Sequence, residues 1–346
     1  MSGMAMSDLA VAVTRAGGLG FIGYNDFPVL EEQLQQSREL LLQDKGTTVT
    51  LAAAVAVDVL PLGVGIIVAF AGSTLAFSPL FAKHKPAVVW LSFGEATDFK
   101  TWTDAIRAAS PQTKVWIQVG SVRAALEAAQ ACHPDALVLQ GSDAGGHGHA
   151  RGASIVALIP EVADALNDDH GGHGGLSDIS LIATGGIMDG RGVAAALALG
   201  ASGVVMGTRF LAAEEIKVSE GYRNEILSAS DGGEATVRSH IFDQMGRYQW
   251  SALYDGRSLR NTWYDDWQRG ISVEEIRSKR DLKVDGSRSG DGDANFRDTN
   301  SVWAGAGVGL VKKVEKAGDI VERARNEAKQ RLQSTIDRLA ATANSE

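Results

Sequence analysis

The sequence predicts an α/β fold closed as a TIM-type (β/α)8 barrel, and three observations support this. Apolar runs of strand length alternate with segments of helical spacing over the first two hundred residues. The runs are apolar throughout, as expected of parallel strands that are covered on both faces. Two successive runs end in glycine turns at 184–186 and 207–208, a pattern typical of the phosphate-binding end of such barrels. A doubly wound open sheet is the alternative.

Strands and helices can be assigned in order along the chain. A first helix over 8–16, capped by Ser7 or Asp8, should end at Gly17 and Gly18. The expected strands are 19–23, 64–70, 87–91, 114–119, 136–140, 179–183 and 203–206. The expected helices are 27–43, 50–60, 74–83, 98–109 (capped by Asp98), 122–132, 153–166 and 192–199. No strand precedes the first helix, so the barrel is predicted with its first strand missing and two exposed edges.

The character of the chain changes after residue 211, which suggests three parts. The barrel is expected at 1–211. Segment 212–300 is richer in aromatic and charged residues and is expected to form an appended, mostly helical lid. Segment 301–346 should contain a long helix, over 311–339, that packs back on the barrel. Its apolar stripe drifts too much for a strict heptad.

Composition limits the classes of partner. The chain has 346 residues and a net charge of −9, which argues against nucleic acid and anionic membranes. The single cysteine, Cys132, allows no disulfide within the chain and fits a cytoplasmic location. No metal site is expected. The most apolar stretch, 49–71, is too interrupted for a membrane span; the interruptions are Asp58, Pro61, Gly63 and Gly65.

The tandem turns form the first candidate site. Gly185 and Gly186 end one strand, and Gly207 and Thr208 end the next. Glycines let a ligand approach the backbone, and amides at a helix start attract anions. We therefore expect a phosphate cradle. The adjacent Arg209 is either a phosphate ligand or a structural ion-pair residue, and the sequence leaves this open.

A second candidate site is the glycine-rich stretch 139–152, LQGSDAGGHGHARG, which follows a strand. It should lie at the barrel mouth, where active sites are built. His147 is the candidate proton acceptor within it, because imidazole exchanges protons near neutral pH. The role of His149 stays open. His170 and His173, in a polar turn, are taken as parts of a solvated loop.

Gln118 ends another expected strand and should point into the mouth. Its amide can donate and accept hydrogen bonds, as the pyrimidine edge of a flavin or a substrate would require. The alternative is a turn residue that is satisfied within the protein. Gly65 closes a further strand at the same end.

At this point four motifs can be compared with known families. They are LAVAVTRAGGLGFIG (9–23), VWLSFG (89–94), VLQGSDAGGHG (138–148) and ATGGIMDGRGVAAALALGASGVVMGTRFLA (183–212). With them the chain resembles the nitronate monooxygenase family, formerly called 2-nitropropane dioxygenases, and its fungal-like branch most closely. Weaker similarity continues through 230–239 and 303–311. The resemblance covers nearly the whole chain.

The resemblance implies an FMN flavoprotein with the cofactor at the barrel mouth. The residues it implies in cofactor binding are Met1, Gly65, Gln118, Gly145, Gly146, Gly185, Gly186, Val205, Met206, Gly207 and Thr208. His147 matches the catalytic histidine of the family, which takes the α-proton of a nitroalkane or stabilises the nitronate. The implied oxidoreductase reaction is the oxidation of an alkyl nitronate by O2 to a carbonyl compound and nitrite, without a nicotinamide.

The chain departs from the family at its start. Family members begin with a strand that ends in a Pro-Met turn, and here only Met1 could correspond to its end. Two alternative functions stay open. One is a flavin-dependent NAD(P)H enoyl-thioester reductase of the same superfamily, and the other is a truncated, non-catalytic paralogue. A homodimer is one option for the assembly.

Overall fold

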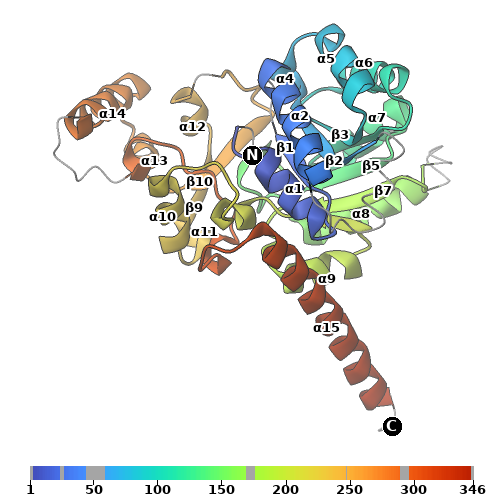
Figure 1. The fold of residues 1–346 in the computed structure, drawn as a ribbon. Helices are drawn as coiled ribbons and strands as arrows, with labels where there is room; N and C mark the ends of the chain where they lie inside the picture. Colours follow the sequence, from blue (N-terminus) through green and yellow to red (C-terminus); the bar gives the residue numbers. More distant parts are fainter. Residues whose placement is uncertain are drawn as a thin grey trace.

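A computed structural model describes residues 3–23, 27–43, 59–168, 176–246, 248–288 and 296–343 (Figure 1). Met1, His170 and His173 lie outside these ranges, as does the expected helix 50–60 except for its last two residues. Of those two, Leu60 begins a strand.

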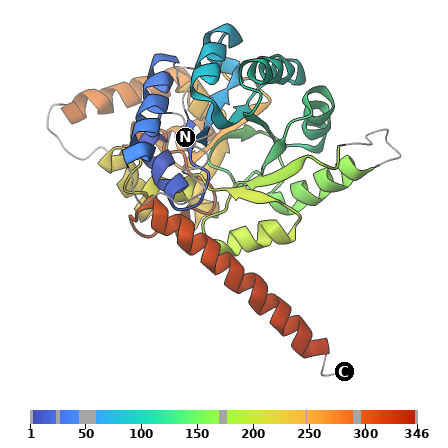
Figure 2. The same ribbon diagram turned by 45° about the vertical axis from the view of Figure 1, so that its right-hand side comes forward.

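The described chain contains a curled sheet of seven parallel strands, arranged in chain order as β1-β2-β3-β4-β5-β7-β8 (Figures 1 and 2). The strands are β1 (Phe21–Gly23), β2 (Leu60–Ile67), β3 (Pro86–Ser92), β4 (Lys114–Val119), β5 (Ala136–Gln140), β7 (Ser180–Thr184) and β8 (Gly203–Val205). The prediction of a parallel α/β barrel with seven strands is confirmed, and the sheet forms a half-barrel whose outermost strands are β1 and β8.

Helices cover the convex face of this sheet (Figure 2). They are α1 (Ser7–Arg15), α2 (Phe27–Gln43), α4 (Val68–Ala71), α5 (Thr74–His84), α6 (Ala96–Ala109), α7 (Val122–Cys132), α8 (Ile155–Asn167) and α9 (Gly190–Ala198). The buried apolar residues of the strands and helices form one continuous core between them. This arrangement explains why the strands read as uninterrupted apolar runs.

Two predicted helix caps are wrong. Met6 is the residue before α1 and makes no capping hydrogen bond through its side chain. The Ser7 hydroxyl donates to Gln36 Oε1 instead, at 2.8 Å. Helix α6 begins after Glu95 rather than at Asp98. The Asp98 carboxylate accepts the Glu95 N–H at 3.0 Å, so Asp98 acts from the first turn of the helix.

The strand expected at 64–70 is shifted. It begins at Leu60, whose N–H donates to Lys85 O, and its expected end is the short helix α4. The glycines that look like strand breakers belong to the strand. A Cβ on Gly63 would lie 2.1 Å from the Phe21 ring, so glycine is required there by the close approach of an aromatic side chain.

The concave face of the half-barrel is packed with side chains. Trp90 and Trp116 lie beside Val138, Ile182 and Val205. The Phe21 ring, whose centroid is 5.4 Å from that of Trp90 and 5.6 Å from that of Trp116, fills the same space. This filling is typical of barrel interiors, which are cores rather than pores.

The outer edge of β1 is partly covered. Gly3 N–H donates to Gly23 O at 2.8 Å, and Gly23 N–H donates to Ala5 O at 3.1 Å. Segment 3–5 therefore satisfies backbone groups where the sequence predicts an open edge, which lowers the tendency of that edge to pair with other chains. Lys217 N–H in turn donates to Met4 O.

The segment after the barrel is mainly helical and also contains a sheet that the sequence analysis missed. Its helices are α10 (Glu220–Ser228), α11 (Gly232–Ala235), α12 (Ile241–Gln244), α13 (Thr262–Gln268) and α14 (Val273–Arg288). Strands β9 (Thr236–Ser239) and β10 (Tyr254–Leu259) pair with β6 (Gly146–His149), in the order β6-β10-β9. The glycine-rich loop of the barrel is thus tied to the appended segment by antiparallel strands.

The last helix, α15, begins at Ala317 and not at 311 (Ala317–Ala343). Residues 311–316 are not helical because this segment pairs with the chain after β8: Glu315 N–H donates to Ala212 O, and Glu214 N–H donates to Glu315 O. The first half of α15 packs on α9, and the second half runs away from the body (Figures 1 and 2). Among the described helices, none has the length and hydropathy needed to cross a bilayer.

Candidate active site

The carboxyl ends of β5 and β7 bring two glycine turns into contact. A Cβ on Gly185 would lie 2.9 Å from Gly141 O, and one on Gly186 would lie 3.0 Å from Asp143 Cβ. Gly185 and Gly186 have φ of +115° and +73°, values that only glycine adopts without strain. The turn after β7 is therefore pressed against the loop after β5. Both the positive φ and this close contact require glycine at 185 and 186.

A late segment of the chain joins this pair of turns to the third. Gly305 N–H donates to Thr208 Oγ1 at 3.0 Å, and Ala306 N–H donates to Asp143 O at 2.9 Å. A Cβ on Gly145 would lie 2.4 Å from Ala304 C. The turns after β5, β7 and β8 thus share one end of the half-barrel, held together by loop 304–306.

Other glycines of this end face open space. Among the described residues, a Cβ on Gly146 or Gly207 would meet no heavy atom within 4 Å, and one on Gly65 would meet only backbone atoms, the nearest at 3.8 Å. The packing of the described chain therefore does not require glycine at 207. Bare backbone beside open space suits a flat or anionic ligand.

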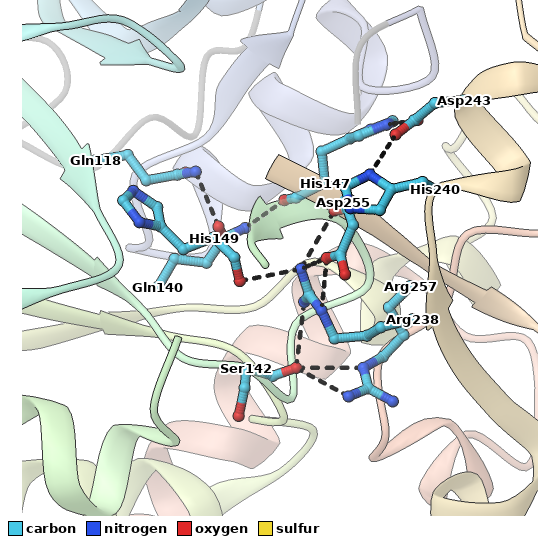
Figure 3. Close-up of polar contacts among 10 residues, drawn as sticks. All are labelled: Gln118, Gln140, Ser142, His147, His149, Arg238, His240, Asp243, Asp255 and Arg257. Atoms are coloured by element: carbon cyan, nitrogen blue, oxygen red, sulfur yellow. Dashed lines mark hydrogen bonds and ion pairs between the residues drawn. The ribbon is translucent and has the colours of Figure 1, made fainter. Parts of the chain in front are cut away.

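His147 lies on β6, beside these turns (Figure 3). Its Nε2 is 2.5 Å from Asp243 Oδ1 on α12, and both side chains are nearly buried. The indole of Trp250 stacks on the imidazole, with ring centroids 3.7 Å apart and planes 11° apart. Trp303 packs on the ring at a tilt, with a centroid distance of 4.9 Å. The imidazole is therefore held in one orientation by a carboxylate and two indoles.

An aromatic wall extends from Trp250. Its ring centroid lies 4.8 Å from that of Phe70, 5.0 Å from that of Phe93 and 6.3 Å from that of Tyr254. Phe93 has a φ of +58°, an uncommon conformation for a bulky residue and typical of functional sites. The surroundings of His147 are thus apolar on the Trp250 side.

Gln118 is linked to the same strand through a second glutamine (Figure 3). Gln118 Nε2 donates to Gln140 Oε1 at 3.1 Å, and Gln140 Nε2 donates to His147 O at 3.0 Å. The Gln118 amide therefore has a partner within the protein, and it also fixes the backbone of His147 through Gln140.

Two arginines support the base of the glycine-rich loop. Arg238 pairs with Asp255. Arg257 donates through Nε and Nη2 to Ser142 O, at 3.2 and 3.1 Å (Figure 3). Burial and the neighbouring Arg238 cation lower the pKa of Arg257. These contacts satisfy a backbone carbonyl of the loop from the side of the appended sheet.

His149 and Arg209, whose roles the sequence left open, have structural partners. The His149 ring lies edge-on to Tyr254, 5.2 Å away, and burial lowers the pKa of His149, with a further contribution from Arg238. Arg209 is buried and pairs with Glu315. An ion pair therefore accounts for the position of Arg209.

The remaining residues expected at the site line the half-barrel. Val205 O accepts the Thr184 hydroxyl at 3.2 Å, and the Val205 side chain packs near the two tryptophans of the concave face. Met206 is half-buried between the main core and the cluster under α15. Within the ranges that the structure describes, no three His, Cys, Asp or Glu side chains are grouped so as to hold a metal ion.

Four side chains that contact or support His147 were missed: Asp243, Trp250, Gln140 and Trp303. Gln140 and Trp303 stand inside motifs already singled out, and strand alternation on 136–140 could have found Gln140. Asp243 and Trp250 lie about a hundred residues from His147 in a segment without periodicity. Only the pairing of β6 with β10 brings that segment near the loop.

A parallel half-barrel with a buried histidine and glycine turns at its carboxyl end has the architecture of an α/β-barrel enzyme. The nitronate monooxygenase profile matches residues 1–326, and the chain belongs to this family. It is 42% identical to nitronate monooxygenase npaC of Metarhizium robertsii, over 96% of this chain and 90% of that protein. It is 38% identical to the nitronate monooxygenase of Neurospora crassa, over 95% and 87%.

The fold is also shared with solved structures. The structure of FabK from Thermotoga maritima superposes with a TM-score of 0.69 at 27% identity, and the match covers 99% of this chain and 93% of that one. The two chains share the fold, and their sequence identity is lower than the 42% and 38% found with the two nitronate monooxygenases.

Proposed function

We propose that this protein is an FMN-dependent oxidoreductase that converts alkyl nitronates and O2 to a carbonyl compound and nitrite. The observation that carries the proposal is the chain of contacts that joins His147, through Gly145 and loop 304–306, to Thr208. It brings His147 and the glycine turns to one end of the half-barrel, which supports a proton acceptor and a phosphate site side by side. Family membership supports the same reaction.

The residues present fit a flavin mononucleotide. The amides of Gly185, Gly186, Gly207 and Thr208 would hold its phosphate, because glycine turns at strand ends expose N–H groups without side chains. Contacts with the rest of FMN are assigned to Met1, Gly65, Gln118, Gly145, Gly146, Val205 and Met206. When bound, FMN supplies the one-electron chemistry that allows the nitronate to react with O2.

The protein's own part in the reaction falls to His147. A nitroalkane bound beside the imidazole loses its α-proton to a ring nitrogen, and the electrons of the C–H bond form the C=N bond of the nitronate. The resulting imidazolium lies near the anion that it has generated and stabilises it. The indoles of Trp250 and Trp303 exclude water from the ring.

The test is to titrate FMN into the purified protein and then follow O2 uptake with a nitroalkane and with its preformed nitronate. His147→Ala should still bind FMN and should lose about a hundredfold or more of its turnover with the nitroalkane. Its turnover with the nitronate should fall much less, because the proton is already removed. Equal turnover of the nitroalkane by variant and wild type would contradict the role of His147.

The same samples separate the alternatives. An enoyl-thioester reductase would consume NAD(P)H with an enoyl thioester and would show no O2 uptake with nitronates. A non-catalytic paralogue that does not bind flavin would be colourless once unbound FMN had been removed. Either result would overturn the proposed function.

Location, assembly and division of the chain complete the proposal. The acidic net charge of −9 and the single buried cysteine support a cytoplasmic protein that does not bind nucleic acid. We assign the FMN-binding barrel to 1–211, the lid to 212–300 and the returning C-terminal segment to 301–346. A homodimer is testable by light scattering.

A further inference from the structure

Asp243 is a buried carboxylate that the family resemblance does not assign. It lies on α12, in the appended segment, and reaches back to the barrel (Figure 3). Its side chain is 10% exposed and that of His147 is 14% exposed. The 2.5 Å distance between Oδ1 and His147 Nε2 is a short hydrogen bond. A carboxylate that is almost excluded from water normally has a compensating partner, and here the partner is the candidate base.

The chemistry of this bond fixes which nitrogen carries the proton. An ionised carboxylate only accepts hydrogen bonds, so Nε2 must be the protonated nitrogen of neutral His147. The lone pair then resides on Nδ1. Among the described residues, Nδ1 has no hydrogen-bond partner, whereas Nε2 has Asp243. Nδ1 is the nitrogen left to meet a substrate.

We propose that Asp243 is a positioning residue that holds His147 in its Nε2–H tautomer, so that Nδ1 is the atom that takes the α-proton of the nitroalkane. This inference rests on the proposed function. In the step, the Cα–H bond breaks, its electron pair forms C=N, and the negative charge moves to the nitro oxygens. The proton forms a bond with Nδ1, and the imidazolium is stabilised by the Asp243 carboxylate, as in other acid–base pairs of this kind.

The surroundings of Asp243 agree with this role. The Trp250 stack hinders rotation of the imidazole about its own bond, and the hydrogen bond from Gln140 to His147 O holds the backbone of His147. Asp243 Oδ2 is buried without a hydrogen bond within the described chain, and His240 Nδ1 is 3.9 Å from it. His147 is therefore the main hydrogen-bond partner of the Asp243 carboxylate.

The kinetic test compares Asp243→Asn with Asp104→Asn, the same change at an exposed position on α6, where Asp104 pairs with Lys100. Asp243→Asn should lower kcat for the nitroalkane about a hundredfold or more, because an amide permits the wrong tautomer and cannot compensate the imidazolium. Oxidation of the preformed nitronate should change less than about threefold. Asp104→Asn should match wild type with both substrates.

Several outcomes would overturn the proposal. An equal loss with both substrates would show that Asp243 only holds α12 in place, and no loss would show that it has no role. Oxidation of the nitronate by wild type without any oxidation of the nitroalkane would also overturn it, while leaving the proposed function standing.

A second measurement depends neither on activity nor on the folding of Asp243→Asn. Nitrogen-15 NMR of wild-type protein labelled at histidine, with the His147 signals assigned by their loss in His147→Ala, reports which ring nitrogen is protonated. We expect a proton on Nε2 and none on Nδ1 near neutral pH. A proton on Nδ1 would overturn the inference even if the protein oxidises nitronates, and the expected result would support it even if the protein oxidises none.

Discussion

His147 and His149 are two residues apart on β6, yet charges of opposite sign act on their rings. His147 contacts a carboxylate. The His149 ring lies against Tyr254. Among charged groups, the guanidinium of Arg238 has the largest effect on the pKa of His149. A cation and burial both disfavour a second positive charge. The two histidines of the loop are thus set up for different tasks, and only His147 has a partner that stabilises its protonated form.

The surroundings of His149 predict a pH dependence of stability. Its pKa is lowered from the ordinary 6.5 in the folded protein, so below about pH 6.5 the unfolded chain binds a proton that the folded chain does not, and stability falls. His149→Phe keeps an aromatic ring and removes the titration. The variant should therefore lose less stability than wild type between pH 7.5 and pH 5.5, measured as the urea midpoint.

The matched control for that experiment is His133→Asn, at the exposed left-handed end of α7. Asparagine tolerates this conformation, so this variant should follow the wild-type pH dependence. A wild-type-like loss of stability in His149→Phe would show that His149 is not the residue responsible.

At the scale of elements, the turn after β8 offers a way to test phosphate binding separately from folding. Gly207 has a negative φ, −101°, and open space at its Cβ position. Gly207→Ala should therefore leave the melting temperature of the apoprotein nearly unchanged while weakening FMN binding about tenfold or more, about 1.4 kcal/mol. Fluorescence titration of FMN measures this.

The control is Gly233→Ala, because Gly233 is an exposed residue of α11. A Cβ there would have Asp231 Oδ1 at 3.7 Å as its nearest neighbour. This variant should bind FMN as wild type does. If Gly207→Ala also kept wild-type affinity, the phosphate would not lie against this turn.

Glu315 connects the start of α15 to the barrel. It pairs with Arg209, Arg323 and Lys313. Hydrogen bonds from Arg323 are the main reason that the pKa of Glu315 is lowered to about 2, with Lys313 and Arg209 contributing. Arg209 itself is buried and has one nitrogen, Nη1, without a hydrogen bond among the described residues. The carboxylate is thus the main compensation for a buried cation.

Glu315→Gln should therefore lower the free energy of unfolding at pH 7 by roughly 3 kcal/mol, because it leaves the Arg209 charge uncompensated. The contribution of Glu315 is complete above its ordinary pKa of 4.5 and is lost as the pH falls toward about 2. The difference between variant and wild type, followed by urea denaturation, should shrink over that range. A difference that stays constant down to pH 2 would contradict this account.

The elements of the barrel were largely predictable, and the reasons are local. Strands 114–119 and 136–140 and helix 122–132 have the predicted bounds, because apolar runs and serine caps are written in adjacent residues. The early start of β2 was not predictable, since the Phe21 ring that explains Gly63 lies in another strand. The three-stranded sheet was missed for the same reason: β6 reads as a glycine loop until β10 pairs with it.

The residues of the candidate site also differ in how far they could be predicted from local sequence. The glycines and His147 stand in motifs, and the sequence alone was enough to propose them as site residues. Asp243 and Trp250 depend on a fold-back of about a hundred residues, which no pattern in their own segment indicates. The ion pair of Arg209 needed Glu315, which lies 106 residues further along.

At the scale of the whole molecule, α15 is supported over only part of its length. Ala324 and Ala328 of α15 are buried. Gly190, at the start of α9, is in close contact with this part of α15: a Cβ there would lie 2.3 Å from Glu327 Cβ and 2.5 Å from Ala328 N. Beyond Ala328, Ile336 and Leu339 are 59% and 67% exposed. The free energy that α15 contributes should therefore come from its first half.

A chain that ends at residue 332 should unfold within about 0.5 kcal/mol of the full-length protein, because surface segments without buried contacts contribute little. Gly190→Ala should cost several times more, since the added methyl group meets backbone and Cβ atoms that cannot move aside. Thermal denaturation of the two variants beside wild type tests both statements. A large loss on truncation would show that the exposed half of α15 has a partner in solution.

Loop 304–306 has a consequence for biosynthesis. The amides of Gly305 and Ala306 join Thr208 to Asp143, so the ribosome must translate residue 306 before these two turns can be held together. The half-barrel emerges from the exit tunnel long before that, with its rim unfinished. If this end of the half-barrel holds the proposed cofactor, we expect the nascent polypeptide to capture it only after residue 306 has left the exit tunnel.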